Sequence, residues 1–153
     1  MSLICTTFAQ GKNNILMKKL IFSLFIAFSA INGYAQDSQS FKGYIYNKEY
    51  DVYIRMNFYE QDITVPNQEI FGNVAGFFGD NIDSRKWLFT SAEIKANVAH
   101  IAIINDYGSE DLEANLTQIN DSTFELEQLN GSRIKIARNR KWLKLPDRIT
   151  FTK

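Results

Sequence analysis

The chain has 153 residues, with 17 basic and 17 acidic side chains, and 45% of its residues are hydrophobic. This balance of charge points to no particular class of partner. Its single cysteine, Cys5, excludes an internal disulfide framework.

Residues 17–36, MKKLIFSLFIAFSAINGYAQ, have the three parts of a secretory signal. Lys18 and Lys19 form a basic head, 20–31 is an apolar run, and 33–35 places small residues where a signal peptidase cleaves. The run is shorter than the roughly 20 residues that span a bilayer, although a buried helix or a retained anchor is the alternative. We therefore predict a helical signal peptide at 17–35, cleavage near Ala35 and no transmembrane anchor in the mature protein.

Two further predictions follow from this leader. Residues 1–16 precede the signal and read as an upstream extension, with Met17 as the true start. Residues 36–153 have a length that suits one domain with one hydrophobic core. They lack Cys5, so neither a thiol nucleophile nor a lipid anchor on cysteine is expected in a product that is periplasmic or secreted.

Alternation of apolar and polar residues dominates the mature chain and predicts strands. In 52–59 one face carries Val52, Ile54, Met56 and Phe58, which indicates a long half-buried strand preceded by another at 41–47. Further strands are expected at 69–78, 86–94, 97–106, 112–119, 123–129, 133–137, 141–146 and 148–152. Asn130-Gly131 is the strongest two-residue hairpin signal, and it predicts that 133–137 folds back onto 123–129.

These segments, taken together as eight or nine short strands with turns between them, predict an all-β domain. We expect an antiparallel up-and-down meander closed into a barrel, because consecutive hairpins need no long crossover and closure removes free edges. A β-sandwich is the alternative.

This layout resembles the calycin group of small barrels, the lipocalins and avidins, which implies a small exported barrel. The chain departs from both families. It has Gly43-Tyr44-Ile45 where a lipocalin carries Gly-x-Trp, and only Trp87 and Trp142 where an avidin places several tryptophans. No ligand residue is carried over from either family.

Charge is unevenly distributed. Seven acidic residues and no basic residue lie between Lys95 and Arg133. The segment 133–153 has the opposite balance, with eight basic residues and a single acidic residue, Asp147. The predicted hairpin would place Arg133 and Lys135 beside Glu125 and Glu127 as cross-strand ion pairs. It leaves Arg138, Arg140, Lys141 and Lys144 without a nearby acid, which makes them candidate partner-binding residues.

Motifs for catalysis are missing. His100 is the only histidine, so we expect it to be a hydrogen-bonded strand residue and not part of a metal site or a triad. We expect no metal, no cofactor, no nucleic-acid partner and no assignable catalytic residue, and the sequence leans away from an enzyme.

Tyrosines crowd the first two strands, and tyrosine suits flat sugar or peptide ligands. Tyr53, Arg55 and Tyr59 are candidate ligand-binding residues in an exposed stripe, with Trp87 as a further candidate. The leading hypothesis is an exported, non-enzymatic β-barrel module that binds a small molecule or a glycan. The alternatives are an envelope interaction or inhibitor protein that acts through the basic surface at 138–144, and a small carboxylate-based hydrolase.

Overall fold

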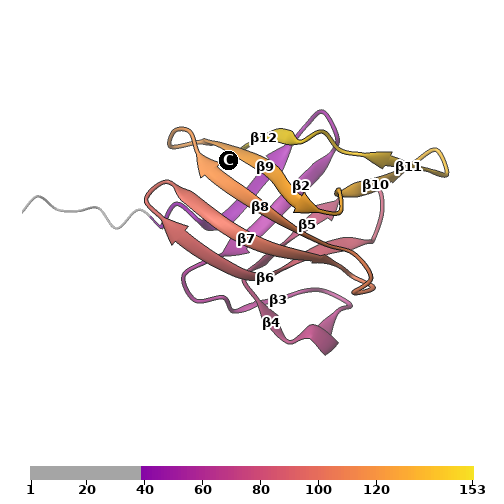
Figure 1. Ribbon diagram of the computed structural model, residues 1–153, viewed down its shortest axis with the longest axis horizontal. Helices are drawn as coiled ribbons and strands as arrows, with labels where there is room; N and C mark the ends of the chain where they lie inside the picture. The colour runs from indigo at the N-terminus through magenta and orange to yellow at the C-terminus, as the bar shows by residue number, and fades with distance from the viewer. Residues whose placement is uncertain (1–38) are drawn as a thin grey trace, which may run out of the picture. The chain divides into compact units, whose positions relative to one another are not determined.

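The computed structural model describes residues 39–153, so the predicted extension, signal peptide and cleavage point lie outside the described residues. Within 39–153 eight antiparallel strands form a closed up-and-down barrel, which confirms the predicted fold over the sandwich alternative (Figure 1). The barrel strands are β1 (Lys42–Asn47), β2 (Val52–Asn57), β5 (Gly76–Asp80), β6 (Lys86–Lys95), β7 (Val98–Asn105), β8 (Asp111–Gln118), β9 (Thr123–Gly131) and β12 (Arg148–Thr152). Pairing between β1 and β12 closes the barrel.

Two short hairpins interrupt this meander. The first lies between β2 and β5 and comprises β3 (Ile63–Thr64), the 3-10 turn η1 (Glu69–Phe71) and β4 (Asn73–Val74). The second lies between β9 and β12 and comprises β10 (Lys135–Arg138) and β11 (Lys141–Lys144). Figure 1 shows β10 and β11 projecting past the barrel wall, with β3 and β4 beneath the barrel.

The barrel interior is filled by the alternating apolar side chains. Val52, Ile54, Met56 and Phe58 are all buried in it, as the period of two predicts. Aromatic rings contribute much of the interior, and Phe78 meets Phe151 edge to face with ring centroids 6.4 Å apart.

A second apolar cluster lies on the outer face of β5 and β6. Phe77 and Leu88 point out of the barrel and are buried by Val65 and Val74 from the β3–β4 hairpin. This outer cover explains why β5 and the first part of β6, Trp87 to Phe89, are buried on both faces. The prediction of one continuous strand at 69–78 is wrong. This segment begins in η1, forms β4 of the outer hairpin up to Val74, and enters the barrel only at Gly76, where β5 begins.

The predicted hairpin at Asn130-Gly131 is also wrong. Strand β9 continues through both residues, and Gly131 pairs with Leu112 of β8 beside a register shift. Glycine is needed there because a Cβ at Gly131 would lie 2.5 Å from the carbonyl oxygen of Asp111. The two-residue turn lies instead at Asn139-Arg140, where both residues have positive φ.

The predicted cross-strand ion pairs change with this pairing. Strand β12 occupies the position beside β9, and Arg148 pairs with Glu127 at 2.7 Å. Arg133 pairs with Asp147 at 3.0 Å, and Lys135 pairs with Glu110. The hypothesis of pairs with Glu125 and Glu127 failed because β10 pairs with β11 and not with β9.

Candidate functional site

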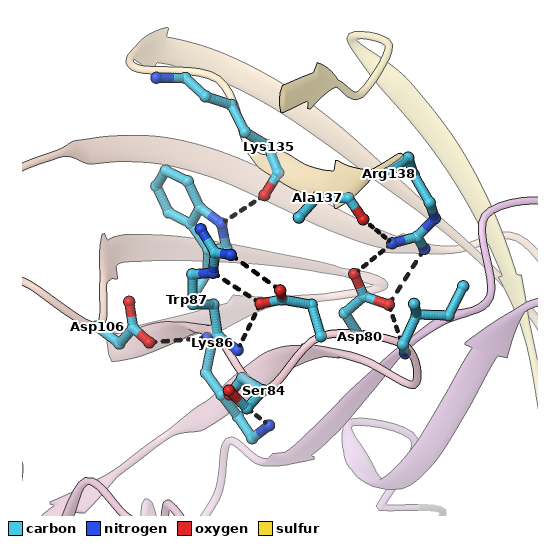
Figure 2. A network of polar contacts seen from close by, with 11 residues as sticks. Asp80, Ser84, Lys86, Trp87, Asp106, Lys135, Ala137 and Arg138 are labelled. Atoms are coloured by element: carbon cyan, nitrogen blue, oxygen red, sulfur yellow. Dashed lines mark hydrogen bonds and ion pairs between the residues drawn. The ribbon is translucent and has the colours of Figure 1, made fainter. Parts of the chain in front are cut away.

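The β10–β11 hairpin covers the end of the barrel at which β5 ends and β6 begins. Three of its apolar side chains, Ile134, Ile136 and Leu145, are buried in the interior cluster. The indole Nε1 of Trp87 donates a hydrogen bond to the carbonyl oxygen of Lys135 at 3.4 Å (Figure 2). The hairpin is therefore a fixed cap on the barrel.

Arg138 anchors the other end of β10. Its Nη1 lies 2.6 Å from Oδ2 of Asp80 and its Nη2 lies 3.1 Å from Oδ1, as Figure 2 shows. Nη2 also donates to the carbonyl oxygen of Tyr50 in the β1–β2 turn. The Asp80 side chain is only 4% exposed, so Arg138 supplies the partner that this buried carboxylate requires.

A cleft of about 230 Å³ lies between the cap and the turn that joins β7 to β8. Trp87 and Trp142 contribute to its lining, together with Tyr107 from the turn. Its charged lining includes Arg85, Lys135, Asp106 and Glu110. The cleft thus combines aromatic surface with hydrogen-bonding groups, which is the composition of a small-ligand site.

Trp142 offers an open aromatic surface at this cleft. Its side chain is 58% exposed, and the Arg85 guanidinium lies over its ring at 4.3 Å from the centroid. Two hydrogen bonds of 2.7 and 2.9 Å from Arg85 to Asp83 fix that guanidinium. They hold the pKa of Asp83 below its ordinary value, and Asp83 in turn raises the pKa of Arg85.

The β7–β8 turn is held by Asn105, whose side chain is buried. Its Oδ1 accepts hydrogen bonds from the backbone N–H groups of Ser109 and Glu110. Its Nδ2 donates to Ser109 Oγ at 3.0 Å. Glu110 also receives the Lys135 ammonium, which ties the turn to the cap. Tyr107, at the tip of this turn, is 78% exposed.

The structure does not bring the four predicted ligand-binding residues together. Tyr53 is half-buried and stacks on Tyr44 with ring centroids 5.2 Å apart, so the expected exposed stripe is not formed. Tyr59 is exposed, and its hydroxyl accepts a hydrogen bond from the N–H of Phe41. Trp87 belongs to the buried interior cluster and also lines the cleft.

Arg55 lies at a separate site, a wide hollow of about 520 Å³ on the outer wall of β1 and β2. Tyr44, Lys42 and Glu60 also line this hollow. Lys42 and Glu60 form an ion pair of 2.8 Å that lowers the pKa of Glu60 and raises that of Lys42. This pair matches two of the four charged residues that line the hollow, and the other two are Arg55 and Asp62.

The four predicted partner-binding residues divide into two kinds. Arg138 is half-buried and held by Asp80, so it belongs to the cap and not to an open surface. Arg140, Lys141 and Lys144 are exposed. Nδ1 of His100 donates a hydrogen bond to Oδ1 of Asn115 on the neighbouring strand at 3.1 Å, as expected of a strand histidine.

Sequence reasoning did not select Trp142, Arg85 or Tyr107. Alternation along 141–144 places Trp142 on one face with Lys144, which is a sign of an exposed indole. An aromatic residue inside the polar turn DYGSED was a similar sign for Tyr107. Nothing in the sequence shows that Arg85 lies over Trp142, since this contact joins segments far apart in the chain.

Comparisons of the chain with protein-family models, with curated proteins and with solved structures find no match. In the part of the chain that the structure describes, no helix has the length and apolar character needed to cross a membrane.

Proposed function

We propose that this protein is an exported, non-enzymatic β-barrel module that binds a glycan, one sugar ring of which lies in the cleft beside Trp142. The observation that carries the proposal is the exposed indole of Trp142, held at the mouth of the cleft by Arg85. Export is supported by the signal pattern at 17–35.

The chemistry of the cleft suits a sugar. A pyranose ring has an apolar face of C–H groups that packs on an aromatic ring, and its rim of hydroxyls both donates and accepts hydrogen bonds. Trp142 and Tyr107 supply aromatic surface, while Asp106 and Arg85 supply an acceptor and a donor. The volume of about 230 Å³ falls below the roughly 300–1,000 Å³ of drug-sized pockets, so one ring of a longer glycan fits best.

The state of Glu110 favours binding over catalysis. Lys135 donates to one oxygen of this carboxylate, and the Asn105 side chain lies 3.4 Å from the other. Because both of its oxygens already have protein partners, this carboxylate is less available to a substrate.

The hydrolase hypothesis has one observation in its favour, the presence of Asp106 and Glu110 in a single cleft. Asp106 also accepts a hydrogen bond from the backbone N–H of Lys86, as Figure 2 shows. Release of reducing sugar from a bound glycan, abolished by Glu110→Gln, would establish this second candidate in place of the first.

A glycan array followed by titration calorimetry tests the proposal. We expect Trp142→Ala to weaken binding at least about tenfold, since an aromatic anchor of a small site contributes more than about 1.4 kcal/mol. Tyr44→Ala is the matched control, because Tyr44 is an exposed aromatic residue of the separate hollow. Loss of binding in Tyr44→Ala but not in Trp142→Ala would show that the glycan binds in the hollow and not in the cleft. An array with no bound glycan would refute the proposal.

Export is tested separately. N-terminal sequencing of the protein recovered from the cell envelope or the medium should start at Gln36 or a close neighbour. An intact precursor in the cytosol would contradict this part of the proposal.

A further inference from the structure

Strand β11 has a free edge. Each of the eight barrel strands has two strand neighbours, whereas within residues 39–153 β11 pairs with β10 alone. All four of its residues are exposed. A strand with an unpaired edge can accept another extended chain through main-chain hydrogen bonds.

The register shows which backbone groups face away from β10. A two-residue turn joins Arg138 to Lys141, so this pair and the pair Ile136 and Leu143 are the hydrogen-bonded ones. The bond of 2.9 Å from the N–H of Leu145 to the carbonyl oxygen of Ile134 continues the same alternation. The N–H and C=O groups of Trp142 and Lys144 therefore point outward from the hairpin.

The charge at this edge is positive and unmatched. Four basic residues of 133–153 have acidic partners at 4 Å or less, namely Arg133, Lys135, Arg138 and Arg148. Among the described residues, Arg140, Lys141 and Lys144 form no ion pair. Three cations without acidic partners thus lie together on β11 and its turn, whereas the fourth such residue of 133–153, Lys153, lies over the ring of Phe124.

The edge is also held in place before any partner arrives. Arg138 fixes β10 to Asp80, and the buried side chains of Ile136 and Leu145 fix the two arms of the hairpin at its base. A preformed edge reduces the conformational entropy lost on binding.

We propose that β11 is a docking edge for an extended acidic segment of another protein, which adds to the β10–β11 sheet as a third strand. Its backbone bonds to the outward groups of Trp142 and Lys144, and its carboxylates lie near Lys141 on one face and Lys144 on the other. A second copy of this chain is a poor occupant, because edge-to-edge pairing would bring two sets of Arg140, Lys141 and Lys144 together. This inference stands independently of the glycan site.

The test uses the protein purified from cells that express the full chain. Its probes are ten-residue peptides that alternate threonine with glutamate, with glutamine or with lysine, and a ten-nucleotide oligothymidylate as a polyanion without a strand-forming backbone. We expect the glutamate peptide to bind on the order of tenfold more tightly than the lysine peptide, with a preference that shrinks as salt is raised. Hydrogen exchange of the Trp142 and Lys144 amides should slow when it binds.

Two variants of one residue separate backbone from charge. Lys144→Gln removes the charge and keeps the N–H, whereas Lys144→Pro removes both. Proline is tolerated on an edge strand whose N–H faces solvent, and Leu143 before it is already extended. We expect Lys144→Pro to weaken binding of the glutamate peptide several-fold more than Lys144→Gln does. The control is Lys48→Gln, which changes an exposed lysine on the β1–β2 turn and should leave the affinity unchanged.

Each of the remaining outcomes overturns the proposal. Equal affinity for the three peptides would show that the edge does not prefer an acidic partner. Binding of the oligothymidylate as tightly as the glutamate peptide, with equal effects of the two Lys144 variants, shows a simple polyanion surface. Unchanged amide exchange at Trp142 and Lys144, or a stable dimer that excludes the peptide, shows that no partner strand is added there.

Discussion

Arg138 and Asp80, 58 residues apart in the chain, form a bidentate ion pair that joins the β10–β11 cap to the barrel. The pair positions both proposed binding surfaces, because Trp142 and Lys144 lie on the same hairpin. A buried carboxylate that loses its cation is left without compensation, which is costly.

Arg138→Gln should therefore destabilise the protein by roughly 2–4 kcal/mol, somewhat less than the largest buried pairs because Arg138 keeps partial exposure. Urea unfolding gives the total change, and hydrogen exchange should rise first in 134–145. Arg140→Gln is the control, since Arg140 is exposed and next to the same turn. Equal stability of the two variants would show that the pair does not hold the cap.

Gly79 leaves space for the ring of Tyr53 across the β2–β5 pair. A Cβ at Gly79 would lie 2.4 Å from Cζ of Tyr53, and that ring is held between Tyr44 and Phe77. Gly79→Ala should cost about 1–3 kcal/mol through overpacking. In a double-mutant cycle the cost should shrink when Tyr53 is changed to Ala. An unchanged cost would place the strain elsewhere.

The outer apolar cluster can be weakened without touching the barrel interior. Val65 is fully buried against the outer face of β5 and β6. Val65→Ala should lower the unfolding free energy by roughly 1–3 kcal/mol. Faster amide exchange in 63–74 than in β7–β9 would show that this hairpin loosens first, whereas uniform exchange would show that the cover and the barrel unfold together.

Acid should loosen the support of Trp142. The folded-state pKa of Asp83 is lowered by Arg85, so the stability that this pair contributes is present above the unfolded pKa of about 4 and is lost as the pH falls through the folded pKa. The contribution is below about 1 kcal/mol, because Arg85 is partly exposed.

Fluorescence measures this loss, because Trp142 is the exposed tryptophan and Trp87 is buried. In the Trp87→Phe background, emission from Trp142 should change as the pH falls below about 4. The change should be absent when Asp83→Asn is added, and the same titration in both proteins would rule out this carboxylate as its source.

The sequence predicted the candidate surfaces unevenly. Charge is read directly from a sequence, and Arg140, Lys141 and Lys144 are exposed as a basic surface requires, whereas their role in binding a partner stays a prediction. Tyr53 was predicted to be exposed because alternation shows only that its side chain points out of the barrel. It does not show that another segment covers that face. In the structure the β3–β4 hairpin brings Ile63 and Phe71 onto the same outer cluster as Tyr53. The cleft was missed since Arg85, Tyr107 and Trp142 come from three separate connections of the barrel.

By itself the sequence determined that this domain is all-β and which side chains fill its interior. Alternation is a local property. In an extended chain, residues such as Ile54 and Met56 lie on the same face, and they are buried together when that face turns inward. Only the tertiary structure decided that β10 pairs with β11 and that β12 takes the place beside β9. Strand pairing is decided by contacts between distant residues, here Arg138 with Asp80 and Gly131 with Leu112, and no local pattern contains them.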